Sequence, residues 1–159
     1  MKIAITGGTG LIGRALCQSL THDGHHCLIV SRTPGEGRAV WDPAKGEIDA
    51  DALAGVDAVV NLAGKNIGQR WSSTTKREIR ESRVQGTQLL AKTLANLDPK
   101  PQVLVSGSAI GYYGPQREGD LGEDAASGEG FLAEVCREWE AATVQAEEAG
   151  IRTVHLRTG

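Results

Sequence analysis

The sequence predicts an α/β protein in which helices cover both faces of a parallel sheet. Short apolar runs alternate with segments whose apolar residues recur at helical spacing, a pattern typical of βαβ units. The first apolar run, residues 3–5, leads directly into the glycine-rich segment T-G-G-T-G-L-I-G at 6–13. With 159 residues, of which 40% are hydrophobic, the chain is about one domain with enough apolar side chains for a core.

Each element is justified by its own pattern. Apolar runs such as 26–30 and 57–62 suit strands that are covered on both faces. An apolar stripe marks the first helix, and it consists of Leu11, Ile12, Ala15, Leu16 and Leu20. The expected strands are 2–6, 26–30, 39–41, 57–62, 102–106 and 151–156, and the expected helices are 10–20, 49–53, 72–97 and 131–149.

Right-handed crossovers between these strands give the order 3-2-1-4-5-6 of a Rossmann-type doubly wound sheet, with three layers α/β/α. Ligands of such sheets bind at the carboxyl ends of the strands. The residues that follow the expected strands are therefore the candidates for a site.

The composition excludes several classes of partner. A net charge of −3 offers no basic footprint for nucleic acid, and no apolar stretch is long enough to span a membrane. The first strand begins at Lys2, which leaves no room for a leader, so we expect a cytoplasmic protein. Cys17, Cys27 and Cys136 are scattered and are expected to be reduced thiols. The histidines of 22–26 straddle a turn, and no metal site is expected.

Gly7, Gly10 and Gly13 give the first strand–helix turn the properties of a phosphate-binding site. Gly7 allows backbone angles that are closed to other residues. Gly10 lets the backbone approach a diphosphate, and Gly13 lets the helix pack on the sheet. The free N–H groups of the helix start then face the anion. Glycine spacing alone also fits a plain βα turn, but the strand–turn–helix context favours a dinucleotide.

The end of the second strand favours NADP(H) over NAD(H). Enzymes that use NAD place an acid there to hold the ribose 2′-hydroxyl. This chain has Ser31 and Arg32 instead, and a guanidinium suits a 2′-phosphate. The alternative is that Arg32 is a solvated loop cation.

Four motifs in order carry a resemblance to a known family: G-G-T-G-L-I-G at 7–13, N-L-A-G at 61–64, V-S-G-S-A-I-G-Y-Y-G at 105–114 and F-L-A-E-V-C-R-E-W-E at 131–140. The chain resembles the atypical extended short-chain dehydrogenases/reductases, the NAD-dependent epimerase/dehydratase-like "epimerase family proteins". Because members carry a second half, the resemblance implies that residues 1–159 are the NAD(P)-binding Rossmann domain and that the C-terminal substrate lobe is absent.

The resemblance also implies which residues contact the cofactor. Segment 61–64 passes the ribose and nicotinamide, although the Asn61 amide also suits bracing of the strand. Trp41 either packs on adenine or belongs to the core. The expected cofactor-binding residues are Gly7, Thr9, Gly10, Leu11, Ile12, Gly13, Ser31, Arg32, Asn61, Leu62, Ala63 and Gly64.

Catalysis in the resembled superfamily uses a serine near the end of the fifth strand and a Tyr-x-x-x-Lys on the next helix. Ser108 matches the serine, and Tyr113 is a second candidate; both also have structural readings. Aligning Glu140 with the acid that follows the motif places Leu132 at the tyrosine and Cys136 at the lysine. Neither side chain replaces the lost chemistry.

Two functions follow from the resemblance. One is the NADP(H)-binding domain of a nucleotide-sugar-epimerase-like oxidoreductase or epimerase acting on an unknown small molecule. The other is a non-catalytic NADP(H)-binding sensor or interaction protein. Relatives also pair as homodimers through the helices at 72–97 and 131–149, where Phe131 and Trp139 suit either an interface or a core.

Overall fold

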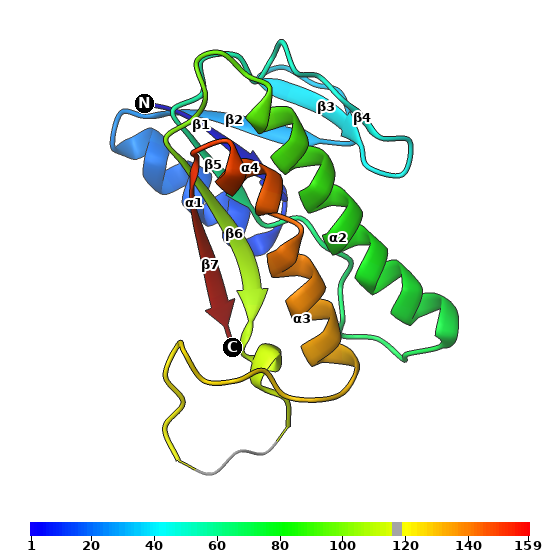
Figure 1. The fold of residues 1–159 in the computed structure, drawn as a ribbon. Coiled ribbons are helices and arrows are strands. Elements are labelled where there is room, and N and C mark those ends of the chain that lie inside the picture. The colour runs from blue at the N-terminus through cyan, green and yellow to red at the C-terminus, as the bar shows by residue number, and fades with distance from the viewer. Residues whose placement is uncertain (116–118) are drawn as a thin grey trace.

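The computed structural model describes residues 1–115 and 119–159, and these form a layered α/β fold (Figure 1). The sheet has seven strands in the order β4-β3-β2-β1-β5-β6-β7. The predicted order 3-2-1-4-5-6 is thereby confirmed, and an antiparallel strand is added beyond β3. The strands are β1 (Lys2–Thr6), β2 (His26–Ser31), β3 (Arg38–Asp42), β4 (Glu47–Ile48), β5 (Ala58–Asn61), β6 (Val103–Ala109) and β7 (Arg152–Thr158).

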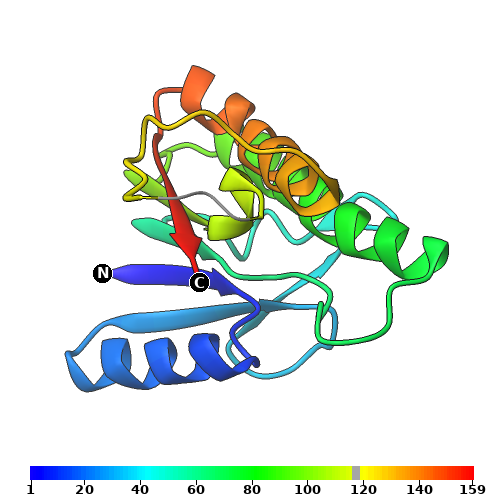
Figure 2. The same ribbon diagram turned by 90° about the horizontal axis from the view of Figure 1, so that it is seen from below.

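The helices lie in two layers, one on each face of the sheet (Figure 2). One layer is α1 (Leu11–His22). The other contains α2 (Ser73–Ala95), α3 (Phe131–Ala141) and α4 (Val144–Glu148), and a short 3-10 helix, η1 (Ile110–Tyr113), follows β6. The three-layer arrangement is as predicted.

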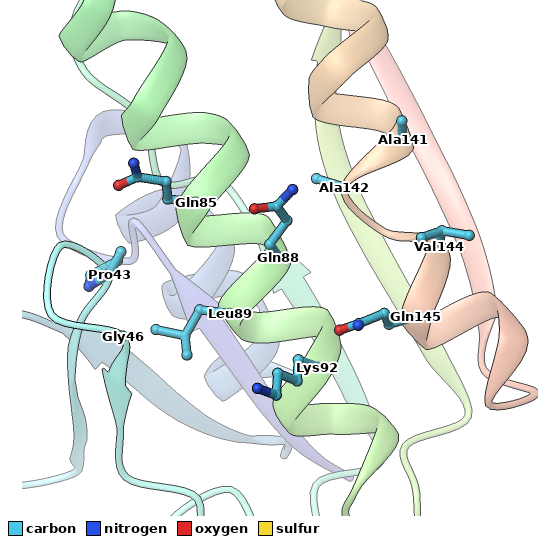
Figure 3. A pocket seen from close by; sticks show the side chains of 10 residues that line it. All are labelled: Pro43, Gly46, Gln85, Gln88, Leu89, Lys92, Ala141, Ala142, Val144 and Gln145. Atoms are coloured by element: carbon cyan, nitrogen blue, oxygen red, sulfur yellow. The ribbon is translucent and has the colours of Figure 1, made fainter.

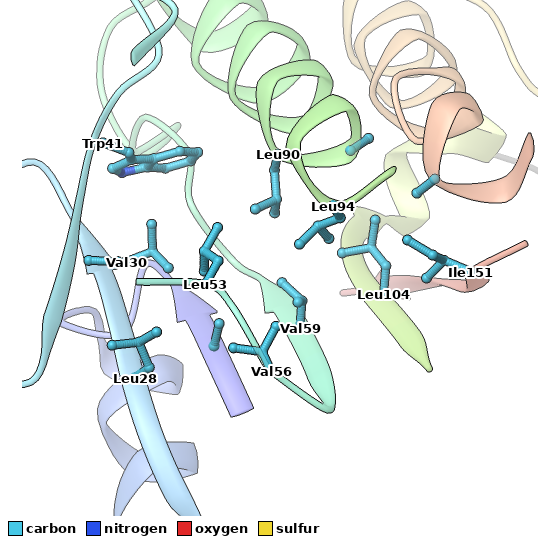
Figure 4. Packing of buried hydrophobic residues seen from close by; sticks show 14 residues of the cluster. Leu28, Val30, Trp41, Leu53, Val56, Val59, Leu90, Leu94, Leu104 and Ile151 are labelled. Carbon is cyan, nitrogen blue, oxygen red and sulfur yellow. The ribbon is translucent and has the colours of Figure 1, made fainter. Parts of the chain in front are cut away.

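The larger core lies between the sheet and the layer of α2 and α4 (Figure 4). Leu90 and Leu94 of α2 meet Leu104 of β6, and all three side chains are fully buried. Trp41 of β3 is also part of this cluster, at 5% exposure, so its indole belongs to the core and not to an adenine site.

The apolar stripe predicted for α1 is wrong in its N-terminal part. Leu11 and Ile12 are 82% and 64% exposed and Ala15 is exposed too, whereas Leu16 and Leu20 pack with Cys17 against β1. The buried residue of the first turn is Gly13, which packs directly on the backbone of the preceding turn. This close approach fixes which face of the helix meets the sheet and leaves Leu11 and Ile12 at the carboxyl edge.

Two predicted helices differ from the structure. Residues 50–55 form successive turns, in which the N–H of Leu53 bonds the Ala50 carbonyl three residues back, and no helix develops. The helix expected over 131–149 breaks between α3 and α4. There the buried Thr143 hydroxyl donates to the Glu140 carbonyl at 2.7 Å, a bond that competes with the regular helical pattern.

The carboxyl ends of the central strands are aligned along one edge. Thr6 is paired with Val30 on one side and with Asn61 on the other, and Asn61 is paired with Ser106. The segments after β1, β2, β5 and β6 therefore start at similar heights, as the candidate site requires.

Candidate cofactor site

The turn after β1 depends on glycine at two positions. Gly7 has φ +68°, and a Cβ there would lie 2.8 Å from the carbonyl carbon of Leu62. A Cβ on Gly13 would lie 2.6 Å from the Cα of Gly8. Both contacts are with backbone, which cannot move aside as a side chain can, so the chain needs glycine here to bring β1, β5 and α1 together.

The start of α1 offers unpaired donors beside open space. Gly10 is the N-cap and provides no side-chain bond, and its N–H donates to the Gly7 carbonyl at 2.9 Å. Among the described residues, no acceptor is found for the N–H groups of Leu11, Ile12 and Gly13. A Cβ on Gly10 would meet the Gly7 oxygen alone, at 3.2 Å. Exposed amides at a helix start next to such space suit a diphosphate.

The loop after β2 contains Ser31 and Arg32, which are predicted to contact the 2′-phosphate of the cofactor. The Ser31 hydroxyl accepts from the Thr33 N–H at 3.0 Å and donates to the Thr33 carbonyl at 2.8 Å, so it shapes the loop. Arg32 is exposed and, in the part of the chain that is described, forms no ion pair. Sequence analysis missed Arg38, whose Nε would lie 3.1 Å from a Cβ on Gly35 in the same loop.

Asn61 braces the sheet from inside. Its amide oxygen accepts from the Thr6 hydroxyl at 2.6 Å, and its amide nitrogen donates to Thr87 at 2.8 Å and to Ser106 at 3.3 Å. The side chain is 1% exposed. The amide therefore performs the bracing role considered for it, and the indole N–H of Trp139 joins the network by donating to Thr87 at 3.0 Å.

The segment after β5 runs beside the glycine turn. The N–H groups of Leu62 and Ala63 donate to the Thr6 hydroxyl at 3.1 and 3.2 Å, which holds the segment against β1. Gly64 is exposed. Ala63 and Gly64 are small, and they leave the backbone accessible at the boundary between β1 and β5, where the winding of the sheet changes direction.

Ser108 and Tyr113 belong to one cluster, together with two residues that the sequence analysis did not assign to the site. The Ser108 hydroxyl donates to Glu140 at 2.6 Å. Arg157 donates to both carboxylate oxygens of Glu140 at 2.9 Å and to the Tyr113 hydroxyl at 2.8 Å. Its guanidinium also lies 3.6 Å from the centre of the Tyr112 ring. The signal was an arginine directly after the last expected strand and an acid on a helix face that is otherwise buried.

The charges of this cluster support one another. Burial alone raises the pKa of Glu140, but the hydrogen bonds from Arg157 and Ser108 and the charge of Arg157 outweigh burial and hold this pKa below its ordinary value. The bonds to Glu140 in turn raise the pKa of Arg157. Glu140 is therefore a carboxylate at neutral pH and accepts the hydrogen bond that the Ser108 hydroxyl donates.

Leu132 and Cys136, at the positions aligned with the tyrosine and lysine, lie on α3 against η1. The Cβ of Leu132 and the Sγ of Cys136 would be 3.4 and 3.9 Å from a Cβ on Gly111. Burial raises the pKa of the Cys136 thiol, which stays protonated at neutral pH. The thiol of Cys27 is similar, since burial and a hydrogen bond with Cys17 raise its pKa to about 12. All three cysteines are free.

Two hollows in the described structure bear on where a ligand could bind. One of about 430 Å³ lies between α2, α4 and the β3–β4 turn, and none of the predicted site residues lines it (Figure 3). The other, of about 620 Å³, is lined by Tyr113 and residues 127–130, beside the cluster of Ser108. Within residues 1–115 and 119–159, no group of three metal-ligating side chains and no helix long and apolar enough to cross a membrane is found.

The fold and the glycine turn together define a nucleotide-binding protein of the Rossmann class, and comparison with known proteins gives the family. The sequence model of the NAD dependent epimerase/dehydratase family matches residues 3–159, and the chain belongs to this family. An epimerase family protein of Mycobacterium leprae is 44% identical over 160 residues, which cover 99% of this chain and 52% of the relative. The chain thus spans about half the length of such relatives.

Two solved structures share the whole fold of the chain. A nucleoside-diphosphate sugar epimerase of Corynebacterium glutamicum is 42% identical with a TM-score of 0.88, covering 100% of this chain and 34% of the other. The human epimerase family protein SDR39U1, solved with NADPH, is 38% identical with a TM-score of 0.86, covering 100% of this chain and 54% of the other. The chain is an NAD(P)-binding domain of this family.

Proposed function

We propose that this chain is the NADP(H)-binding domain of an epimerase-like oxidoreductase. The observation that carries the proposal is the turn at 7–13, where unpaired amides at the start of α1 lie beside a surface that glycine keeps open. When bound, the nicotinamide supplies hydride transfer, and the protein binds and orients it. We assign the diphosphate to the turn of Gly7, Gly10 and Gly13, and the backbone of 62–64, which is exposed at Gly64, to the same cofactor.

A preference for NADP(H) is supported by the loop after β2. No acid stands directly at the end of this strand, and the exposed Arg32 occupies the position at which an acid would hold a ribose hydroxyl. Arg38, whose side chain lies under Gly35, adds a second guanidinium to this loop. The relative SDR39U1 was solved with NADPH, which agrees with the proposal.

Titration with NADPH and NADH tests the preference. We expect Arg32→Gln to weaken NADPH binding about tenfold or more and to leave NADH binding unchanged, because only the 2′-phosphate loses a charged partner. Arg152→Gln, which removes an exposed arginine on β7, is the matched control and should affect neither cofactor. Equal affinities of the unaltered chain for the two cofactors would contradict the preference.

We further propose that the chain is the cofactor-binding half of a longer protein. It matches about half of its curated relatives. The face of β6 and β7 on the side of α1 has no helix over it (Figure 2), and Leu156 there is 42% exposed. A second lobe would cover this apolar surface and complete the substrate pocket.

The second candidate function is NADP(H) binding without chemistry. It is favoured by the positions of Leu132 and Cys136, which offer no acid or base, and by the Ser108 hydroxyl, which is held by Glu140. For catalysis, Ser108 would have to turn from Glu140 to a substrate oxygen.

A screen of carbonyl compounds with NADPH and the full-length protein separates the two functions. We expect oxidation of NADPH with at least one compound. Tight NADPH binding without turnover of any compound would favour binding without chemistry.

A further inference from the structure

Arg83 reaches from α2 to the segment that follows β5. Its Nη1 donates to the Lys65 carbonyl at 3.1 Å and to the Ile79 carbonyl at 3.2 Å. A Cβ on Gly64 would lie 3.1 Å from the guanidinium carbon, so the guanidinium is directly against this glycine. Arg83 therefore stands at the carboxyl edge of the sheet, beside the segment assigned to the cofactor.

The charge of Arg83 is not balanced within the described structure. Its neighbours have carboxylate partners: Lys65 pairs with Glu78 at 3.2 Å, and Arg80 pairs with Glu134 at 3.1 Å. Arg83 has no such partner in residues 1–115 and 119–159 and lies instead over the Trp139 ring, 5.1 Å from its centre. Burial lowers its pKa, which means that the surroundings disfavour its charged form.

The remaining donors of Arg83 are available to a ligand. The two carbonyl bonds use Nη1, and within the described residues Nε and Nη2 have no protein acceptor. Neither nitrogen is enclosed, since the one enclosed side-chain nitrogen without a hydrogen bond in the described part is Nε of Arg80, which instead pairs with Glu138 at 3.3 Å. A guanidinium whose Nη1 is held by the protein can still donate from Nε and Nη2 to two oxygens of a carboxylate or a phosphate.

We propose that Arg83 binds the carboxylate or phosphate group of the substrate next to Gly64. The inference rests on the proposed function, because that function places the cofactor beside this segment. The Trp139 ring and Gly64 lie against the guanidinium and hold it in place. Its free Nε and Nη2 donors are therefore oriented before the ligand binds. The substrate class is then an anion, and Arg83 contributes to its selection over neutral carbonyl compounds.

The test follows the backbone amide signal of Gly64 and the indole signal of Trp139 by NMR while inorganic phosphate or malonate is added. Saturating NADPH occupies the diphosphate position of the turn at 7–13, so that added phosphate is left to bind at Arg83. In a parallel titration without NADPH, the difference between the unaltered chain and Arg83→Gln reports on Arg83. We expect both probes to shift these signals and to bind about tenfold more weakly to Arg83→Gln, with Arg83→Lys between the two. Arg77→Gln removes an exposed cation of the same helix and should change nothing.

The NADPH affinity of each variant identifies the source of the anion. Unchanged NADPH affinity in Arg83→Gln, together with the loss of probe binding, supports a substrate anion. Loss of NADPH affinity with unchanged probe binding would overturn the inference, because Arg83 would then serve the cofactor. Equal probe affinity in Arg83→Gln and the unaltered chain would also overturn it. Failure of the unaltered chain to bind NADPH would instead contradict the proposed function, and the titration without NADPH would still decide the role of Arg83.

Discussion

Replacing Arg157 with methionine is expected to lower the free energy of unfolding by about 3 kcal/mol at neutral pH, since breaking a buried ion pair leaves an uncompensated charge. The side chains of Glu140 and Arg157 are only 12% and 21% exposed, and their nitrogen and oxygen atoms meet at 2.9 Å. Methionine keeps much of the packing on Tyr112 but leaves the Glu140 carboxylate with the Ser108 hydroxyl alone. Urea unfolding of the variant measures the loss.

The stability that Arg157→Met loses is expected to depend on pH, because Glu140 titrates differently with and without Arg157. In the unaltered chain the pKa of Glu140 lies below the ordinary value of 4.5, so its contribution to stability is present above that pH and is lost as the pH falls through the folded-state pKa. Without Arg157, burial dominates and raises this pKa, so protonation stabilises the variant. The difference in stability between the two proteins should therefore shrink below pH 4.5.

Arg152→Met is the control for this experiment, because it changes an exposed arginine of the same strand. We expect its unfolding to follow that of the unaltered chain at every pH. If Arg157→Met were as stable as Arg152→Met at neutral pH, or kept the pH dependence of the unaltered chain, then the Glu140–Arg157 pair would not stabilise the fold.

The elements that the sequence predicts well are those whose cause is local. The strands at 26–30 and 57–62 follow from the apolar runs 27–30 and 58–60, because a strand covered on both faces needs apolar side chains along most of its length. The turn at 7–13 follows from its glycines, since two of them prove to lie where a Cβ would meet backbone. Such requirements are visible in a few consecutive residues.

Features that depend on distant residues were not predicted. Ser108 binds Glu140, 32 residues later in the chain, and only the packing of α3 on β6 brings them together. The break at Thr143 depends on its hydroxyl, which also bonds Glu147 and His155. Leu11 and Ile12 fit a helical stripe by spacing alone, but the close packing of Gly13 turns another face to the sheet. No pattern within one element contains this information.

Replacing Gly10 with valine is expected to weaken NADPH binding at least tenfold while the fold is kept. The backbone of Gly10 has φ −76°, which any residue adopts, and a Cβ there approaches the Gly7 oxygen alone, at 3.2 Å. The cost to the free energy of unfolding is about 1 kcal/mol, because valine is a poor N-cap. The added methyl groups, however, fill the space through which a diphosphate would reach the amides at the start of α1.

Gly13→Ala is expected to lower the stability of the fold, whereas Gly10→Val is expected to weaken cofactor binding. Its Cβ would meet the Cα of Gly8 at 2.6 Å, so we expect a loss of at least about 1–3 kcal/mol in the free energy of unfolding. Gly122→Ala, where a Cβ meets nothing within 4 Å, should change neither stability nor NADPH affinity. Titration with NADPH and urea unfolding of the three variants give both quantities. If the Gly10→Val chain folds and keeps its NADPH affinity, the turn at 7–13 is not part of the cofactor site. This conclusion holds whatever stability Gly13→Ala loses.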